Sequence, residues 1–247
     1  MPAPARSLSD TVIVVSGAGG GIGGAIARLA IEAGARVVAG DLREDALAAL
    51  LAEHDQDRLV VAAGDMRHEA TADALVAAGV DAFGRVDSVV ANAAVGFYGG
   101  VLDVTSDEVE LMVDVNVLGT AWLARSAVRQ FRTQGDGGDI VIIGSVAGLL
   151  IGGGQEAVYA ATKGAQINLG TALDRELRDE GIRTTVIAPA GVNTAFAAAD
   201  GRFGDSAPQD GPFMEPADIA GAVLHTLGQP RRMRTELWTM WSLAEKH

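Results

Sequence analysis

The chain contains no cysteine, so neither disulfide bonds nor thiol chemistry is available to it. Its four histidines, His54, His68, His225 and His247, are scattered along the sequence and form no HxxxH or HExxH pair. This scatter predicts that the protein holds no metal ion. Only 7 prolines stand against 32 glycines, a balance typical of a globular protein with many tight turns.

Long apolar runs are also missing. No run approaches the roughly 18 residues that a membrane-spanning helix needs, and residues 1–10 lack the apolar core of a signal peptide. The net charge of -13 argues against nucleic acid or an anionic membrane as a partner. We therefore expect a soluble, cytoplasmic protein that acts on small molecules.

Short apolar runs alternate with longer helical patterns through most of the 247 residues. Strands are expected at 12–15, 36–39, 59–62, 86–91, 140–143, 184–188 and 235–238. Helices are expected at 22–33, 46–54, 69–83, 105–132, 157–180 and 217–227. This alternation predicts an α/β fold of the Rossmann type, a doubly wound parallel sheet of about seven strands with helices on both faces. Without an internal repeat or a linker, residues 1–247 are expected to form a single domain.

A glycine-rich turn, Ser16 to Gly23, joins the first expected strand to the first helix. Free amides at a helix N-terminus bind phosphate, and glycines let the backbone approach a pyrophosphate closely. The strict GxGxxG pattern occurs only two residues later than the turn suggests, and the spacing of Gly17, Gly21 and Gly23 fits the strand end better. The turn predicts dinucleotide binding.

Asp41 ends the second expected strand, 18 residues after Gly23. A carboxylate there can accept hydrogen bonds from both ribose hydroxyls of an adenosine. It would repel a 2′-phosphate by about 1–4 kcal/mol at 4 Å, so the sequence favours NAD over NADP. Arg43 leaves NADP open, because a guanidinium can bind a phosphate, although a solvated arginine fits the position too. Asp65 and Met66 are expected near the adenine, unless Asp65 is a simple turn residue.

Tyr159 and Lys163 lie four residues apart in an expected helix and therefore stand on one face of it. A phenol loses its proton near pH 10 in water, and an adjacent ammonium group lowers that pKa. The pair is therefore a candidate acid/base. Taken alone, it is more typical of a packed tyrosine with a solvated lysine than of a catalytic pair.

In order and spacing, these motifs resemble the classical short-chain dehydrogenases/reductases over about residues 11–238. The motifs that carry the resemblance are Ser16 to Gly23, Asp41, Asp65, Asn92-Ala93, Asn116, Ser145, Tyr159 with Lys163, and 189–194. The resemblance implies NAD contacts from Ser16, Gly17, Gly19, Gly21, Ile22, Gly23, Asp41, Leu42, Asp65, Met66, Asn92, Ala93, Tyr159, Lys163, Pro189, Val192 and Thr194.

The resemblance also implies four catalytic roles. Tyr159 would be the general acid/base, and Lys163 would hold the nicotinamide ribose and lower the tyrosine pKa. Ser145 would hydrogen-bond the substrate oxygen, and Asn116 would anchor a water that links Lys163 to solvent. Ser145 could instead be a plain strand-end serine, and Asn116 a buried amide satisfied by backbone.

Two positions depart from the family pattern. Ala94 follows Asn92-Ala93 where the family has glycine, and Ala190 follows Pro189 where the family again has glycine. The extra methyl groups would lie near the cofactor, so the loop at Ala94 is expected to shift slightly.

The expected reaction is hydride transfer between nicotinamide C4 and a secondary alcohol or ketone. An NADPH-dependent carbonyl reductase and a non-catalytic dinucleotide sensor are the alternatives. Substrate contacts are expected from Ser145, Gln155, Tyr159 and Phe196, with a substrate loop at about 193–216. A polyol, a hydroxysteroid, a hydroxyacyl thioester and an aromatic alcohol all remain open.

Two long helices, 105–132 and 157–180, carry apolar residues that can face a second subunit, as in the dimers and tetramers of the family. The apolar tail 237–241 also invites an interface. We expect a homotetramer, with a dimer as the alternative.

Overall fold

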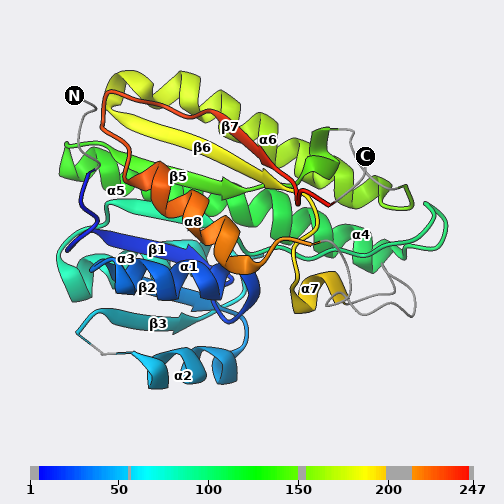
Figure 1. Cartoon of the computed structure of the whole chain (residues 1–247), viewed down its shortest axis with the longest axis horizontal. Helices are drawn as coiled ribbons and strands as arrows, with labels where there is room; N and C mark the ends of the chain where they lie inside the picture. The colour runs from blue at the N-terminus through cyan, green and yellow to red at the C-terminus, as the bar shows by residue number, and fades with distance from the viewer. Residues whose placement is uncertain (1–5, 55–56, 150–153, 199–212, 245–247) are drawn as a thin grey trace.

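The structure is a computed structural model that describes residues 6–54, 57–149, 154–198 and 213–244. Its centre is one parallel sheet with the strand order β3-β2-β1-β4-β5-β6-β7 (Figure 1). The strands are β1 (Val12–Ser16), β2 (Arg36–Asp41), β3 (Leu59–Ala63), β4 (Ser88–Ala91), β5 (Gly138–Ile143), β6 (Ile182–Pro189) and β7 (Leu237–Met240). The predicted fold class and strand number are confirmed.

Helices cover both faces of the sheet, as Figure 1 shows. They are α1 (Gly21–Glu32), α2 (Glu44–Glu53), α3 (Glu69–Phe83), α4 (Ser106–Met112), α5 (Thr120–Gln134), α6 (Ala157–Leu177), α7 (Ala195–Ala198) and α8 (Pro216–Leu227). The short 3₁₀ turns η2 (Val146–Leu149) and η3 (Arg178–Glu180) follow β5 and α6. One core cluster packs α1, α2 and α8 against one face of the sheet, and another packs α3, α5 and α6 against the opposite face.

The β-branched residues of β1 are buried on both faces of the sheet. Ile13 and Val15 belong to the cluster on the α1 face, whereas Val12 and Val14 belong to the cluster on the α3 face. Successive side chains of a strand point to opposite faces, so a run without polar residues suits a sheet that is covered twice. At the carboxyl end of β1, the chain turns into the glycine loop.

The prediction of one continuous α-helix over 105–132 is wrong. Thr105 and Glu108 form the expected capping box, but α4 ends at Met112 and a π-helical segment, η1 (Val113–Gly119), precedes α5. A π-helical turn inserts a residue into the helix and commonly occurs at functional sites. Here, it contains Asn116.

The C-terminal prediction also needs correction. The last strand lies at Leu237–Met240 instead of 235–238, and it pairs in parallel with β6. The ring of Trp238 lies 5.5 Å from that of His225 in α8. Most of the apolar tail is therefore the edge strand of the sheet.

Most of the predicted substrate loop at 193–216 lies outside the described residues. Its described ends are joined by a parallel bridge between Val192 and Met214. Among the described residues, no helix is long and apolar enough to cross a membrane.

Candidate active site

A cleft of about 770 Å³ opens at the carboxyl ends of the strands. In open α/β sheets this edge is where ligands bind, at the point where the strand order reverses, here between β1 and β4. The cleft brings together Gly17, Gly19, Gly21, Ile22, Asp41, Leu42, Asp65, Met66, Asn92, Ala93, Ser145, Tyr159, Lys163, Pro189, Val192, Thr194 and Phe196. Of the predicted site residues, Ser16, Gly23, Asn116 and Gln155 do not line it.

The glycine loop has the shape that a pyrophosphate needs. Gly17 and Gly21 adopt φ values of +67° and +52°, which favour glycine. A Cβ on Gly23 would lie 2.1 Å from the carbonyl oxygen of Gly17, so α1 can pack on the loop only with glycine there. No side chain caps α1 at Gly20, which leaves the first-turn amides available to an anion. The loop therefore fits a dinucleotide.

Ser16 and Asn92 fix the loop from behind. The side-chain amide of Asn92 donates to the carbonyl oxygens of Ser16 and Gly17, each at 3.0 Å. The hydroxyl oxygen of Ser16 accepts from the backbone amides of Asn92 and Ala93, at 3.1 and 3.2 Å. Ser16 thus shapes the cleft without lining it.

Asp41 lines the cleft beside the glycine loop, at the expected adenosine end. Its carboxylate accepts from the amide of Gly19 at 2.8 Å and from the amide of Arg43 at 2.9 Å. The Arg43 guanidinium in turn donates to the Gly19 carbonyl at 3.1 Å. A Cβ on Gly19 would lie 2.7 Å from the carboxyl carbon of Asp41, so this glycine admits the carboxylate.

Asp65 is held by its neighbour Arg67. The guanidinium of Arg67 donates two hydrogen bonds to one carboxylate oxygen, at 2.8 and 2.6 Å. Hydrogen bonding from Arg67 holds the pKa of Asp65 below its usual range. Asp65 therefore faces the cleft as a paired carboxylate.

The catalytic candidates converge where β5 ends and α6 begins. Ser145 stands two residues after the last residue of β5, and its hydroxyl oxygen accepts from the amide of Ala147 at 3.2 Å. The Lys163 ammonium donates to the Ile143 carbonyl at 3.1 Å and lies 5.7 Å from the ring centroid of Tyr159. Serine, tyrosine and lysine thus line one end of the cleft.

Lys163 is 2 % exposed, and its burial lowers the pKa of its ammonium group to about 7. Desolvation disfavours the charged form, and the Ile143 carbonyl opposes this effect by accepting a hydrogen bond from it. Burial is the larger effect, so the charged form of Lys163 is disfavoured relative to a lysine in water.

Asn116 is fully buried in η1, and its side-chain amide has three partners. Its oxygen accepts from the amide of Val95 at 2.8 Å, and its nitrogen donates to the Val95 carbonyl at 2.8 Å. The same nitrogen donates to the hydroxyl of Thr162 in α6 at 3.0 Å. Asn116 is therefore a buried amide whose oxygen and nitrogen both bond to the backbone of Val95, as the second interpretation expected. Its role in anchoring a water stays a prediction.

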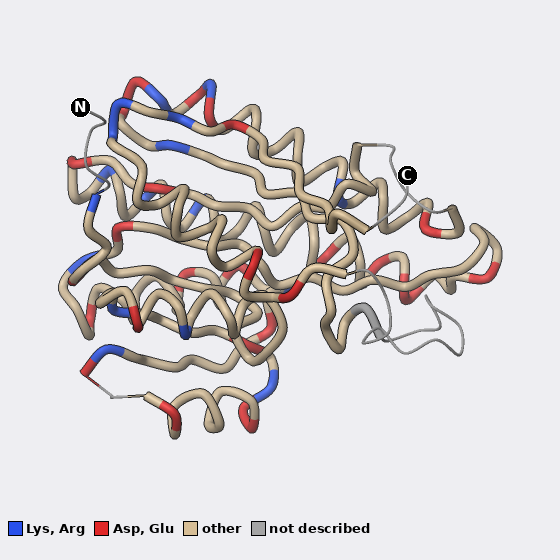
Figure 2. Tube along the Cα trace, in the orientation of Figure 1, with Lys and Arg blue, Asp and Glu red and all other residues tan. Residues whose placement is uncertain are grey.

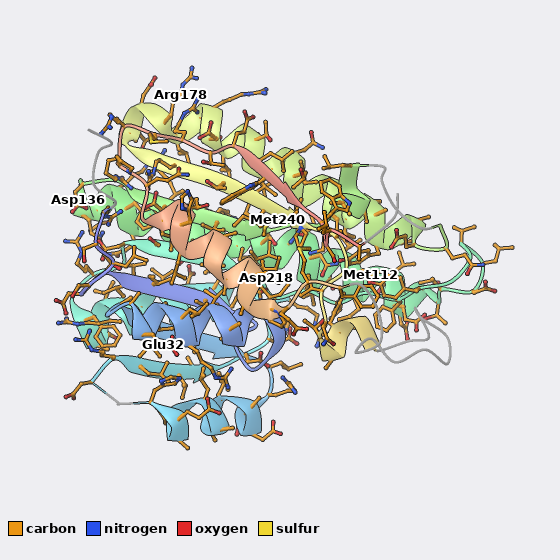
Figure 3. The ribbon with its side chains drawn as sticks, viewed as in Figure 1. Glu32, Met112, Asp136, Arg178, Asp218 and Met240 are labelled. Atoms are coloured by element: carbon orange, nitrogen blue, oxygen red, sulfur yellow. The ribbon has the colours of Figure 1, made fainter. Side chains whose placement is uncertain are left out.

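The end of the cleft around Tyr159 is aromatic. The rings of Tyr98 and Phe196 lie 5.5 and 6.0 Å from that of Tyr159, measured between centroids. Gly96 lies between them, because a Cβ there would stand 2.8 Å from Phe196. Met112 packs in the same cluster, and Figure 3 shows it in the half of the molecule away from Asp136.

The structure places Gln155 away from this cluster. Gln155 is exposed, has a φ of 54° and does not line the cleft, whereas its neighbour Glu156 is buried. Its carbonyl accepts from the amide of Gly99 at 2.7 Å, so it supports the loop that carries Tyr98. Substrate contact by Gln155 stays a prediction.

The two departures from the family pattern cause no backbone strain. Neither Ala94 nor Ala190 has a positive φ. Glycine is needed instead at Gly191, where a Cβ would lie 2.3 Å from the Phe213 ring.

Three polar residues of the site were not predicted from the sequence. Thr162 and Gln166 share the buried face of α6 with Tyr159 and Lys163, and Thr120 begins α5. Helical spacing was a usable signal for two of them, because Thr162 follows Tyr159 by three residues, Gln166 follows Lys163 by three, and residues three apart share a face.

Comparison with known proteins places these features in a family. The chain matches the short chain dehydrogenase family over residues 11–203. It is 34% identical over 226 residues to an uncharacterized oxidoreductase of Staphylococcus aureus strain USA300, covering 92% of this chain and 94% of the relative. An uncharacterized oxidoreductase of Staphylococcus haemolyticus is 31% identical over 223 residues, with 90% and 93% covered.

Solved structures agree in fold. A 3-ketoacyl-(acyl-carrier-protein) reductase from Brucella melitensis complexed with NADH has a TM-score of 0.86 at 28% identity, covering 96% of this chain and 99% of that one. A serine dehydrogenase complexed with NADP+ has a TM-score of 0.85 at 26% identity, with 93% and 94% covered.

The buried ammonium of Lys163 makes stability depend on pH. Because its pKa is lowered to about 7, between pH 7 and about 10 the unfolded chain binds a proton that the folded chain does not. The stability of the wild type relative to Lys163→Met should therefore fall as the pH decreases through this window. Urea unfolding of both proteins across it measures the difference, and parallel curves would contradict the burial effect.

Proposed function

This chain belongs to the short-chain dehydrogenase family, and on that premise we propose that it is an NAD-dependent oxidoreductase that interconverts a secondary alcohol and a ketone. One observation carries the proposal: Ser145, Tyr159 and Lys163 line the same cleft as the uncapped glycine loop. A non-catalytic sensor would need no such set, and every predicted catalytic residue is present.

The bound nicotinamide supplies the hydride chemistry. Tyr159 moves the hydroxyl proton of the substrate, and positioned acid/base help of this kind is worth about 10²–10⁴ in rate. The hydroxyl of Ser145 donates to the substrate oxygen as negative charge develops there, which is typically worth about 10²–10³. Lys163 beneath the tyrosine favours the phenolate electrostatically while it is charged.

Asp41 supports NAD as the cofactor. Its carboxylate lines the cleft where the ribose hydroxyls of an adenosine would donate to it, and a 2′-phosphate would meet like charge. Arg43 is the group that would favour NADP. Its guanidinium already donates to the Gly19 carbonyl and lies 3.6 Å from Asp41, so a phosphate would have to compete with both contacts.

The charge distribution supports an uncharged substrate. Among the described residues that line the cleft around Tyr159, Lys163 is the one with a basic side chain. In Figure 2, acidic residues mark the end of the molecule around α4, whereas most basic residues lie toward the other end of the sheet. Asp103, Asp107 and Glu110 make no ion pair with another described residue. A neutral alcohol or ketone fits this end better than a carboxylate or an acyl group on an acidic carrier.

The chain also leaves apolar surface that supports a homotetramer. In η1, Val113 and Leu118 are 40% and 37% exposed. The outward faces of α5 and α6 carry Trp122, half-buried, and Ala161, exposed. A second copy that covers these faces would bury them.

The function is tested by replacing Tyr159 with phenylalanine. A panel of uncharged secondary alcohols and ketones, each paired with a carboxylate analogue, is first assayed with wild type by NADH absorbance. Tyr159→Phe should lower kcat about 10²-fold or more, because the proton carrier is gone, and should still bind NADH. Phe83→Leu, which alters an aromatic side chain of α3 outside the cleft, is the control. Undiminished turnover by Tyr159→Phe would refute the role of Tyr159.

Cofactor choice is tested by fluorescence titration with NADH and NADPH. Wild type should bind NADH at least about tenfold more tightly, and Asp41→Asn should reduce that ratio because the repulsive charge is removed. Asp45→Asn makes the same change in net charge outside the cleft and should leave the ratio unchanged. Tighter binding of NADPH by wild type would overturn the choice of NAD.

Assembly is tested by sedimentation. The wild type should have four times the 25.3 kDa mass of one chain, and Leu118→Glu should reduce that mass by placing a charge on the covered face. A single-chain mass for the wild type would exclude the tetramer.

A further inference from the structure

A chain of buried polar contacts continues from the catalytic helix into the π-helical segment. Gln166 follows Lys163 by three residues on the buried face of α6 and is 1% exposed. Its side-chain nitrogen donates to the hydroxyl oxygen of Thr120 at 2.7 Å. That hydroxyl donates to the main-chain carbonyl of Asn116 at 2.7 Å.

The hydroxyl of Thr120 bonds the carbonyl four residues earlier, a contact that threonine also makes in regular helices of this chain, as Thr226 does to Ala222. The backbone amide of Thr120 bonds to the Val117 carbonyl, so in this segment the Asn116 carbonyl receives the side chain of Thr120. The other side of Asn116 is held by Thr162, whose hydroxyl accepts from the asparagine amide at 3.0 Å. Helix α6 therefore holds Asn116 at two points. Thr162 bonds its side-chain amide, and Gln166 acts through Thr120 on its main-chain carbonyl.

Stability alone does not account for a glutamine at this position. The side-chain oxygen of Gln166 is buried and has no hydrogen-bond partner among the described residues. A buried acceptor without a partner costs about 1–3 kcal/mol, whereas one neutral hydrogen bond contributes about 0.5–1.5 kcal/mol. An apolar side chain of similar volume would therefore be neutral or stabilising.

We propose that Gln166 is a positioning residue, which acts through Thr120 on the carbonyl of Asn116 and so fixes the π-helical segment beside the catalytic pair. Asn116 in turn holds both backbone groups of Val95, which lines the cleft. Losing the contact at Gln166 lets Asn116 and the Val95 loop relax away from the geometry that the reaction needs. The expected loss of kcat rests on the proposed function, whereas the expected loosening of the π-helical segment rests only on the hydrogen bonds.

Two variants and one matched control test the proposal. Gln166→Leu removes the donor, and Thr120→Val removes the relay hydroxyl with little change of shape. Thr184→Val is the control, because Thr184 is also buried with an unpartnered hydroxyl but lies in β6, away from Asn116. Thr120→Ser keeps the hydroxyl and serves as the conservative rescue.

Kinetics are measured with saturating NAD and the neutral substrate that wild type turns over fastest in the panel. Gln166→Leu and Thr120→Val should each lower kcat about tenfold while leaving the Kd for NADH unchanged. Gln166→Leu should keep the thermal midpoint of the wild type or raise it, and Thr120→Ser and Thr184→Val should keep kcat. The double variant should lose no more than a single one, because both act on one path.

Hydrogen exchange gives a readout that needs no substrate. The backbone amides of residues 113–121 should exchange faster in Gln166→Leu and Thr120→Val than in wild type or Thr184→Val, since the segment has lost an anchor. Unchanged exchange would overturn the proposal. An unchanged kcat in Gln166→Leu would also overturn the positioning role. If Tyr159→Phe lost turnover in the same assay, the proposed function would nevertheless stand. An inactive wild type with faster exchange in the variants would refute the proposed function and keep the positioning role.

Discussion

The hydrogen bond from the Lys163 ammonium to the Ile143 carbonyl is the contact on which the rest of the site depends. It joins a helix to the end of a strand, and the strand end also places Ser145 while the helix also places Tyr159. The bond lies in a desolvated interior, which lowers the pKa of the lysine to about 7. Because the lowered pKa means that the buried ammonium opposes folding near neutral pH, stability alone does not account for a lysine at this position.

The sequence predicted the sheet well because its signals are local. Each buried strand appears as a β-branched run between turns, and in a doubly covered parallel sheet such runs need no polar face. The prediction failed where the structure depends on contacts with segments that are distant in the sequence. The π-helical segment contains Asn116, whose partners Val95 and Thr162 lie in other segments of the chain, and β7 is placed by its register against β6, which no local pattern specifies.

The same division runs through the site. Glycines, Asp41, Tyr159 and Lys163 were predictable because their chemistry follows from residue type and short spacing. The contact between Thr120 and Gln166 was not predictable, since it joins residues that are 46 apart in sequence and belong to different helices. Arg43 was ambiguous from sequence because only its three-dimensional partners show that it braces Gly19.

The two ends of the cleft are therefore built by different physical means. At the adenosine end, backbone amides and charged side chains two residues apart hold one another, as in Asp41 with Arg43 and Asp65 with Arg67. At the catalytic end, buried uncharged side chains link separate helices and leave atoms such as the Gln166 oxygen unpartnered. A binding site can tolerate local, self-sufficient pairs, whereas a reaction requires groups from several elements to be held together. The catalytic end accordingly depends on hydrogen bonds between residues that are far apart in the sequence, such as Asn116 with Thr162 and Gln166 with Thr120.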